Sequence, residues 1–223
     1  MTPIPILVLR LEGLLQSWGE HSKWNYRDSA SMPTKSGIMG MIGCAMGLER
    51  GNPKLAAMGR ELQMAVRADR SGTELIDYQT VQAERLLTAE GKPRTGGNTL
   101  VSYRTYLQDA CFTVAIAGDQ KFLESIQDAL RHPKWAIYLG RKACVPSRPV
   151  LDAITMEFSS LEDAMMHLLP ASERVDENML IEMDCVEGDA DGTQYERQDA
   201  LADGDRNFFR RPVVQKRRSS HVS

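Results

Sequence analysis

Thr34, Lys35 and Ser36 place two hydroxyls and a cation directly before an apolar, glycine-containing stretch typical of a helix. The start of a helix offers main-chain N–H groups without helical partners, and its dipole favours negative charge. Together these groups suit one phosphate. The run therefore predicts an anion site, with Lys35 as its cation and Ser36 as a hydroxyl donor.

The residues before this turn, 14–35, lack a regular apolar pattern and predict a long loop. The loop interleaves aromatic with basic residues: Trp18, Trp24 and Tyr26 among Lys23, Arg27 and Lys35. Bases of a single-stranded nucleic acid stack on aromatic rings while cations pair with its phosphates, so this composition indicates such a ligand. Trp18 alone is more typical of a core residue.

A second polar excursion spans about residues 82–102 and contains Gly91, Pro93, Gly96 and Gly97. Turn-forming residues at this density predict a long hairpin that stands off the body. Its basic residues are Arg85, Lys92 and Arg94. We expect them to hold RNA or a neighbouring protein, and a solvated loop is the alternative.

The sequence gives little support for a metal or a nucleotide cofactor. Its glycine run, GIMGMIG, lacks the GxGxxG spacing, and no glycine precedes Lys35 as a GxxxxGK[ST] loop requires. The four cysteines lie far apart and predict buried free thiols rather than a zinc site or a disulfide framework: Cys44, Cys111, Cys144 and Cys185. We expect no metal and no cofactor.

The elements that must position these residues follow an α+β order. Apolar alternation predicts strands at 4–11, 63–68, 75–81, 103–107 and 111–117, and periodicity predicts helices at 37–48, 53–62 and 120–131. Ser36 is the expected N-cap of the first helix. Its glycines share one face and permit close approach of another backbone: Gly37, Gly40, Gly43 and Gly47. The order is compatible with a ferredoxin-like sheet with insertions.

Charge divides the chain into blocks. The net charge of −3 is the sum of +5 for residues 1–150, −13 for residues 151–209 and +5 for residues 210–223. The local field matters more than the total for a polyanion, so we predict an RNA-binding domain at 1–150 and an acidic C-terminal elaboration at 151–223 that ends in a basic tail. Within the elaboration we expect a helix at 161–169, strands at 179–186 and 208–214, a mobile segment at 187–206 and a disordered tail from 215.

No apolar run approaches the roughly 18 residues needed to span a bilayer. The N-terminus lacks the basic start and the small-residue cleavage site of a signal peptide. We therefore expect no membrane association and a cytoplasmic protein.

Five motifs occur in series over roughly residues 4–150: LVLRLEG, LQSWG, PTKSGIMGMIGCAMGL, YRTYLQDACFTVAI and YLGRKAC. Together they resemble the CasD family of type I-E CRISPR Cascade subunits, in the RAMP superfamily. The resemblance implies a ferredoxin-like, RRM-like domain with a protruding thumb at about 82–102. It also implies a non-catalytic subunit that caps the 5′ handle of CRISPR RNA in RNA-guided antiviral defence. Its partners would be CRISPR RNA, the large subunit and a backbone subunit, with target DNA reached only through the complex.

The resemblance assigns handle contacts to the PTxSG turn, the YRxY strand and the YLGR motif. In this sequence the corresponding residues are Lys35, Ser36, Arg104, Tyr138 and Arg141, with Arg27, Lys142 and Arg148 as weaker additions. Each type fits: arginine binds phosphate or stacks on a base, and tyrosine stacks or donates a hydrogen bond. The RNP1 pattern of a true RRM is absent, so we do not expect bases on the open sheet face.

Two other functions remain open. A metal-free endoribonuclease would need a base, an acid and a cation at the scissile phosphate, and four residues of one loop could supply them: His21, Lys23, Tyr26 and Lys35. The resemblance assigns cutting to a different subunit. A structural adaptor that contacts only protein would suit the acidic segment 151–209, whereas basic residues in three separate motifs argue for RNA.

Overall fold

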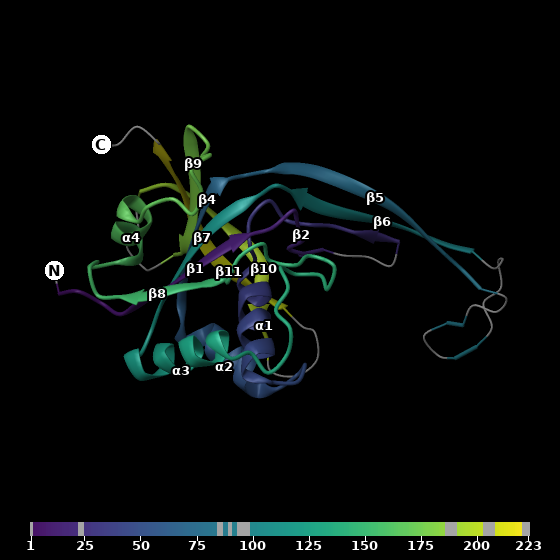
Figure 1. The fold of residues 1–223 in the computed structure, drawn as a ribbon, viewed down its shortest axis with the longest axis horizontal. Helices are drawn as coiled ribbons and strands as arrows, with labels where there is room; N and C mark the ends of the chain where they lie inside the picture. The colour runs from purple at the N-terminus through teal and green to yellow at the C-terminus, as the bar shows by residue number, and fades with distance from the viewer. Residues whose placement is uncertain are drawn as a thin grey trace.

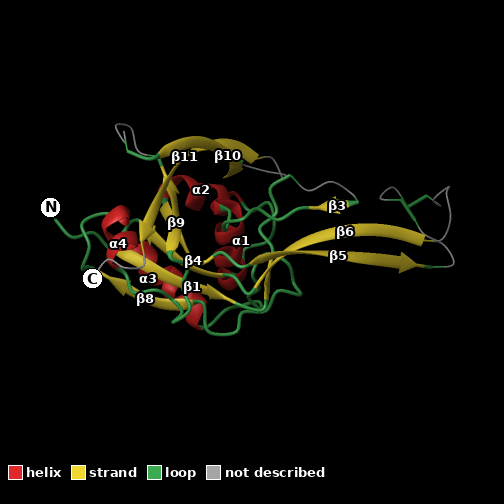
Figure 2. Cartoon of the chain, turned by 90° about the horizontal axis from the view of Figure 1, so that it is seen from above, coloured by secondary structure: helices red, strands yellow, loops and turns green. Residues whose placement is uncertain are grey.

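The computed structural model describes residues 2–21, 25–83, 87–88, 91–92, 99–185, 191–202 and 208–219. Within these ranges the fold is mixed α and β, dominated by a large and a small sheet (Figures 1 and 2), which confirms the α+β prediction. The large sheet contains β1 (Ile6–Glu12), β4 (Gln63–Arg70), β7 (Cys111–Ala117), β8 (Leu151–Thr155), β9 (Asn178–Asp184), β10 (Thr193–Leu201) and β11 (Phe208–Ser219). The small sheet contains β2 (Leu15–Gln16), β3 (Tyr26–Arg27), β5 (Thr73–Gln82) and β6 (Thr99–Gln108). The helices are α1 (Lys35–Met46), α2 (Pro53–Glu61), α3 (Gln120–Arg131) and α4 (Leu161–His167).

The large sheet has the strand order β10-β11-β9-β4-β7-β1-β8, and neighbouring strands are antiparallel. Strand alternation divides its side chains between two cores. Leu7, Leu9 and Leu11 of β1 face α1 and α3, while Ile6 and Val8 face α4. Figure 1 shows α1, α2 and α3 grouped on one side of the sheet and α4 apart from them. All of β7 is buried because it lies between β1 and β4 and both of its faces are covered.

β5 and β6 form a ten-residue antiparallel hairpin that reaches far from the body in both views (Figures 1 and 2). Its pairing begins at Thr73 with Gln108 and runs to Gln82 with Thr99. The excursion predicted at 82–102 is therefore only the outer part of a longer paired structure. Of its predicted basic residues, Lys92 is exposed, while Arg85 and Arg94 lie outside the described residues.

The chain after residue 150 contributes four strands of the large sheet: β8, β9, β10 and β11. β8 pairs with β1, and β9 pairs with β4, so both flanks of the sheet come from this region. Two predictions are wrong here. The segment expected to be mobile, 187–206, contains β10, and the tail expected to be disordered from 215 continues β11 as far as Ser219.

The described part of the basic tail, as far as Ser219, is held by an ion pair and by hydrogen bonds to the region around α4. Lys216 Nζ lies 2.7 Å from Glu162 Oε1 on α4, and Arg218 donates to the main-chain oxygens of Met165 and Leu168. The net charges of residues 151–209 and 210–223, counted separately, did not reveal that these two segments pair with each other. The two charge blocks therefore stabilise one another within the fold.

The start of α1 differs from the prediction by two residues. Thr34, not Ser36, is the N-cap, and its side-chain oxygen accepts a hydrogen bond from the N–H of Gly37. At the other end Gly47 adopts φ +72° and closes the helix, so it does not belong to the helical glycine face. No helix within the described ranges is long and apolar enough to span a membrane.

Candidate nucleic-acid interface

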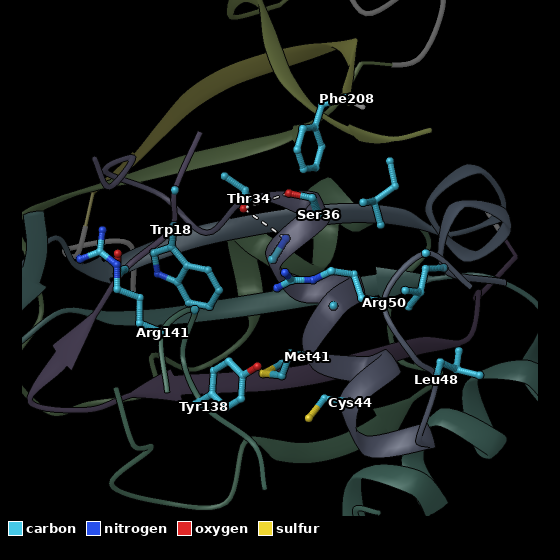
Figure 3. Close-up of a pocket in the computed structure, with 18 of the residues that line it drawn as sticks. Trp18, Thr34, Ser36, Met41, Cys44, Leu48, Arg50, Tyr138, Arg141 and Phe208 are labelled. Atoms are coloured by element: carbon cyan, nitrogen blue, oxygen red, sulfur yellow. Dashed lines mark hydrogen bonds between the residues drawn. The ribbon is translucent and has the colours of Figure 1, made fainter. Parts of the chain in front are cut away.

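A pocket of about 630 Å³ opens over α1 (Figure 3). Its walls come from parts of the chain that are distant in sequence: the 17–19 and 135–141 loops, β3, the segment between α1 and α2, and the adjoining ends of β10 and β11. Four of the eight residues predicted to bind RNA line it: Arg27, Ser36, Tyr138 and Arg141. The fold therefore gathers residues from separate motifs at one cavity.

The exposed face of α1 forms the floor of the pocket. Ser36, Gly40 and Cys44 are spaced at i, i+4 and i+8, so they lie on one stripe of the helix. A Cβ built at Gly40 meets no atom within 4 Å. Gly40 thus leaves the helix backbone open to the cavity, where a planar ligand could approach closely.

The other two glycines of α1 serve packing within the protein. A Cβ at Gly37 would lie 2.9 Å from the ring of Trp18, and one at Gly43 would lie 2.3 Å from Leu55 of α2. Trp18 itself is 1% exposed, which confirms that it is a core residue. The glycine pattern therefore has two explanations: close packing at Gly37 and Gly43, and an open floor at Gly40.

Arg27 and Arg50 supply exposed positive charge at the pocket. Neither guanidinium has a hydrogen bond or an ion pair with any residue in the described part of the chain. In Figure 3 the Arg50 side chain extends toward α1. These two cations can therefore bind an anionic ligand without breaking an existing contact.

Arg141 also lines the pocket, but its guanidinium is already hydrogen-bonded within the protein. It donates to the main-chain oxygens of Thr105, Arg27 and Asp28 at 2.8–3.1 Å and lies 4.7 Å from the centre of the Tyr106 ring. Arg141 thereby ties β3, β6 and the 138–144 loop together. It holds the pocket wall and adds a positive charge to it.

The Tyr-Leu-Gly-Arg loop is fixed by its own backbone. Gly140 has φ +90°, and a Cβ there would lie 1.6 Å from the main-chain oxygen of Ser17. The N–H of Ser17 donates to the oxygen of Leu139, and Leu139 is fully buried. Only glycine permits this approach. Tyr138 and Arg141, on either side, are consequently held at the pocket.

Lys35 already has partners within the protein. Its side chain is buried, and Nζ forms a 2.7 Å ion pair with Asp184 Oδ2 of β9. Its main-chain N–H donates to Asp199 Oδ2 of β10 at 2.7 Å. An internal carboxylate therefore occupies the helix N-terminus that was expected to bind phosphate, and the Lys35 ammonium already has an internal ion-pair partner, so Lys35 as a phosphate ligand stays a prediction.

A buried network of charges holds β9, β10 and β11 against α1 and the preceding loop. Its members are Glu20, Lys35, Glu182, Asp184, Arg197, Asp199 and Arg211. Arg211 donates to both oxygens of Asp199 at 2.8 Å. Burial alone would raise the pKa of Asp199, but the bonds and charge of Arg211, with the Lys35 N–H, outweigh it and lower that pKa.

The remaining predicted contacts lie outside the pocket. Arg104 is on β6, in register with Asp77 of β5 and Arg27 of β3, and its Nε is buried without a hydrogen-bond partner among the described residues. Arg148 is exposed and donates to the oxygen of Ala171. Lys142 is exposed beside the loop. These three residues do not converge on the cavity.

The sequence did not single out several pocket residues. Trp135 and Phe208 contribute partly exposed rings, at 42% and 38%, and Arg50 contributes a cation. Gly40 was noted only as one glycine of four. Phe208 could not have been assigned because it belongs to the C-terminal region, which becomes part of the pocket only through the pairing of β10 with β11.

The cysteines are free, and the prediction that they are buried holds for two of them. Cys111 and Cys144 are buried, whereas Cys44 and Cys185 are partly exposed. Cys44 lines the pocket, and burial raises the pKa of its thiol. It can therefore report on whether the cavity is filled.

Comparison with known proteins points to one family. A family model described as CRISPR-associated protein (Cas_Cas5) matches residues 6–220. The CRISPR system Cascade subunit CasD of Escherichia coli (strain K12) is 31% identical over 176 residues, which cover 74% of this chain and 77% of that protein.

Two solved structures agree in fold and in sequence. A chain of a CRISPR RNA-guided surveillance complex aligns with a TM-score of 0.72 and 32% identity, covering 95% of this chain and 89% of that one. A crystal structure of a Cas protein aligns with a TM-score of 0.67 and 30% identity, covering 95% and 94%. The family model spans both sheets and the whole pocket. This chain belongs to the Cas5 family of CRISPR-associated proteins.

Proposed function

We propose that this chain is a non-catalytic subunit of a type I-E CRISPR Cascade complex that binds the 5′ handle of CRISPR RNA in the pocket over α1. The observation that carries the proposal is the meeting of Ser36, Tyr138 and Arg141 with the open Gly40 floor in one cavity. Those residues come from motifs about 100 positions apart. A planar base near the floor and phosphates at the rim would use all of them.

The division of labour within the pocket follows from the contacts. Arg27 and Arg50 are exposed and uncommitted among the described residues, so they are the proposed phosphate ligands. Tyr138 and Trp135 offer rings for stacking, and Ser36 offers a hydroxyl. Arg141 is proposed mainly to position the wall. Lys142, Arg148 and Arg104 would contact RNA only beyond the cavity.

The fold supports the ferredoxin-like interpretation. With β2, β3, α2 and the β5–β6 hairpin treated as insertions, β1, α1, β4, β7, α3 and β8 give the order β, α, β, β, α, β, and the sheet order β8-β1-β7-β4 is fully antiparallel. The β5–β6 hairpin is inserted between β4 and β7 and is our candidate for the thumb. We propose that residues 1–150 carry most of the RNA contacts, with Phe208 as a contribution from the C-terminal region.

Within the assembly we propose that the subunit lies beside the large subunit and the first backbone subunit, and reaches target DNA only through the complex. A surveillance complex with its guide RNA is the setting described for one similar structure. The acidic region is a weak basis for an adaptor that contacts only protein, because Glu182, Asp184 and Asp199 are paired within the chain.

The endoribonuclease alternative is weakened by the geometry of its candidate residues. Lys35, its proposed cation, is buried in the ion pair with Asp184. Tyr26 stacks on Tyr103 of the hairpin. Lys23 lies outside the described residues. Incubation of the purified chain with labelled repeat RNA in EDTA tests this function directly. Site-specific cleavage would refute the proposal of a non-catalytic RNA-binding subunit.

The proposed RNA binding in the pocket is tested with charge variants at positions that do not support the fold. We expect Arg27→Ala and Arg50→Ala to weaken guide-RNA binding in the assembled complex, and to reduce the slope of log affinity against log salt by about 0.7 to 1 each. Arg131→Ala on α3 is the matched control, since its side chain is 54% exposed and lies outside the pocket. Unchanged binding and slope in both pocket variants would refute the proposal.

A further inference from the structure

Three tyrosines form a cluster where β3 pairs with the β5–β6 hairpin, away from the hydrophobic cores. The rings of Tyr26 and Tyr103 are stacked, with centroids 4.9 Å apart and planes at 16°. Tyr78 meets Tyr103 edge-on, with centroids 5.4 Å apart and planes at 71°. Tyr26 and Tyr78 are 65% and 58% exposed. Exposed ring surface on this scale is available to a ligand.

Strand register places the cluster on one face of the small sheet. Tyr26 of β3, Tyr103 of β6 and Tyr78 of β5 are direct cross-strand partners, so their side chains share a face. The next register pair, Arg27 with Arg104, faces the other way, and Arg27 lines the pocket. One two-residue strand therefore presents a ring on one face and a pocket cation on the other.

β3 is also an open edge of the sheet. It pairs with β6 on one side, and the strand order of the described residues gives it no second neighbour. An extended ligand that leaves the pocket at Arg27 can pass around this edge and reach Tyr26, because the two residues are adjacent in β3. The outer surface of the Tyr26 ring, opposite Tyr103, would be the first stacking surface that it meets.

We infer that Tyr26, Tyr103 and Tyr78 form a second RNA site, a stacking platform for one or two unpaired bases of the guide RNA beyond those held in the pocket. The inference rests on the proposed function and extends it to the opposite face of the hairpin. Stacking on a ring is tolerant of sequence, since every base has a planar face. The platform would fix the path of the RNA without reading its bases.

The surroundings favour a base over a protein partner. Apart from the rings, this face carries mostly polar side chains along the hairpin: Glu74, Ile76, Thr80, Gln82, Thr99, Val101, Thr105 and Leu107. A stable protein interface needs roughly 1,200–2,000 Å² with an apolar centre. The rings, with Ile76 and Val101 beside them, form a small apolar group bordered by threonines, glutamine and glutamate, which is small for the centre of a protein interface and sufficient for a base.

The platform is tested in the complete complex, reconstituted with guide RNA that carries a single 2-aminopurine at successive positions of its 5′ segment. Stacking on an aromatic ring quenches the fluorescence of this base. Tyr26→Ala and Tyr78→Ala remove exposed rings, and Tyr26→Phe and Tyr78→Phe keep the rings without the hydroxyls. Val81→Ala is the matched control, because Val81 is 48% exposed on the other face of the same strand.

We expect quenching at one or two positions, lost in the alanine variants and kept in the phenylalanine variants and in Val81→Ala. Guide-RNA affinity should fall about 5- to 150-fold per ring lost. Unchanged fluorescence at every position would overturn the platform, as would loss of a neighbouring protein subunit from the complex without any fluorescence change. Arg50→Ala is measured in parallel: if it weakens RNA binding while the tyrosine variants do not, the platform fails and the proposed function stands. If neither set has an effect, both fail.

Discussion

The carboxylate of Asp199 accepts a hydrogen bond of 2.7 Å from the main-chain N–H of Lys35, the first residue of α1. The chain thus supplies its own anion at the helix N-terminus, from a strand more than 160 residues away. The same carboxylate is held by Arg211 of β11. The contact joins the floor of the pocket to the β10–β11 wall, and the phosphate contacts that we propose fall to Arg27 and Arg50.

Replacement of Asp199 by alanine is expected to destabilise the protein strongly. The variant leaves Arg211 buried with a reduced set of anions and the Lys35 N–H without its acceptor, and loss of one partner of a buried pair costs about 3–5 kcal/mol. Denaturant unfolding measures the change. Glu196→Ala is the control, because its pair with Arg210 is exposed at 58% and 76% and should contribute under about 1 kcal/mol. Equal effects of the two substitutions would contradict the assignment.

The pH dependence of stability should also depend on Asp199. Its pKa in the folded protein is lowered, so its contribution is present above the unfolded value of about 3.9 and is lost as the pH falls through the folded pKa. Asp199→Asn removes this titration. We expect the variant to be less stable near neutral pH and to lose less stability than the parent protein between about pH 5 and the acid limit. Parallel pH profiles for the two proteins would exclude this role.

Local patterns predicted the elements that are built from short-range signals. The strand Cys111–Ala117 and the helix Gln120–Arg131 were expected at their observed bounds, because continuous apolar character and a single apolar stripe determine them. Trp18 was correctly assigned to the core. The resemblance to a known family located Ser36, Tyr138 and Arg141, which the fold does bring to one pocket.

The features that local patterns missed share a physical cause, which is pairing over long sequence distances. Lys35 looked available because Asp184 and Asp199 are about 150 positions away. The segment 187–206 and the tail from 215 looked mobile because their acidic and basic residues stabilise a hairpin only when β10 and β11 are adjacent. No local rule detects such partners.

Gly140 should tolerate no side chain, because a Cβ would collide with the main chain of Ser17 in addition to straining the backbone conformation. Gly140→Ala would place a Cβ 1.6 Å from the Ser17 oxygen, so the loop must move and stability should fall by several kcal/mol. Gly51→Ala is the matched control: Gly51 has φ +83° but open space around it, so only a conformational penalty of about 1 kcal/mol is expected. Thermal unfolding compares the two. Similar losses would show that the contact with Ser17 is unimportant.

Thiol labelling should distinguish the cysteines and report on the pocket. Burial raises the pKa of Cys111 to about 12, whereas Cys44 is partly exposed, so iodoacetamide should modify Cys44 before Cys111, and faster as the pH increases. Guide RNA in the pocket should protect Cys44 while leaving Cys185 unchanged. Peptide mass spectrometry resolves the sites. Equal labelling of Cys44 with and without RNA would argue against an occupied cavity.

Gly40 offers the most direct test of the proposal that guide RNA binds over α1. A Cβ at this position meets no atom within 4 Å, so Gly40→Ala should stabilise the helix by about 1 kcal/mol and leave RNA binding nearly unchanged. Gly40→Leu should also fold, but its side chain projects into the cavity and should block close approach of a base. The decisive measurement is guide-RNA retention by complexes reconstituted with each variant. We predict retention near the parent level for Gly40→Ala and at least a tenfold loss of affinity for Gly40→Leu, about 1.4 kcal/mol, whereas parent-level retention by a folded Gly40→Leu variant would contradict the account.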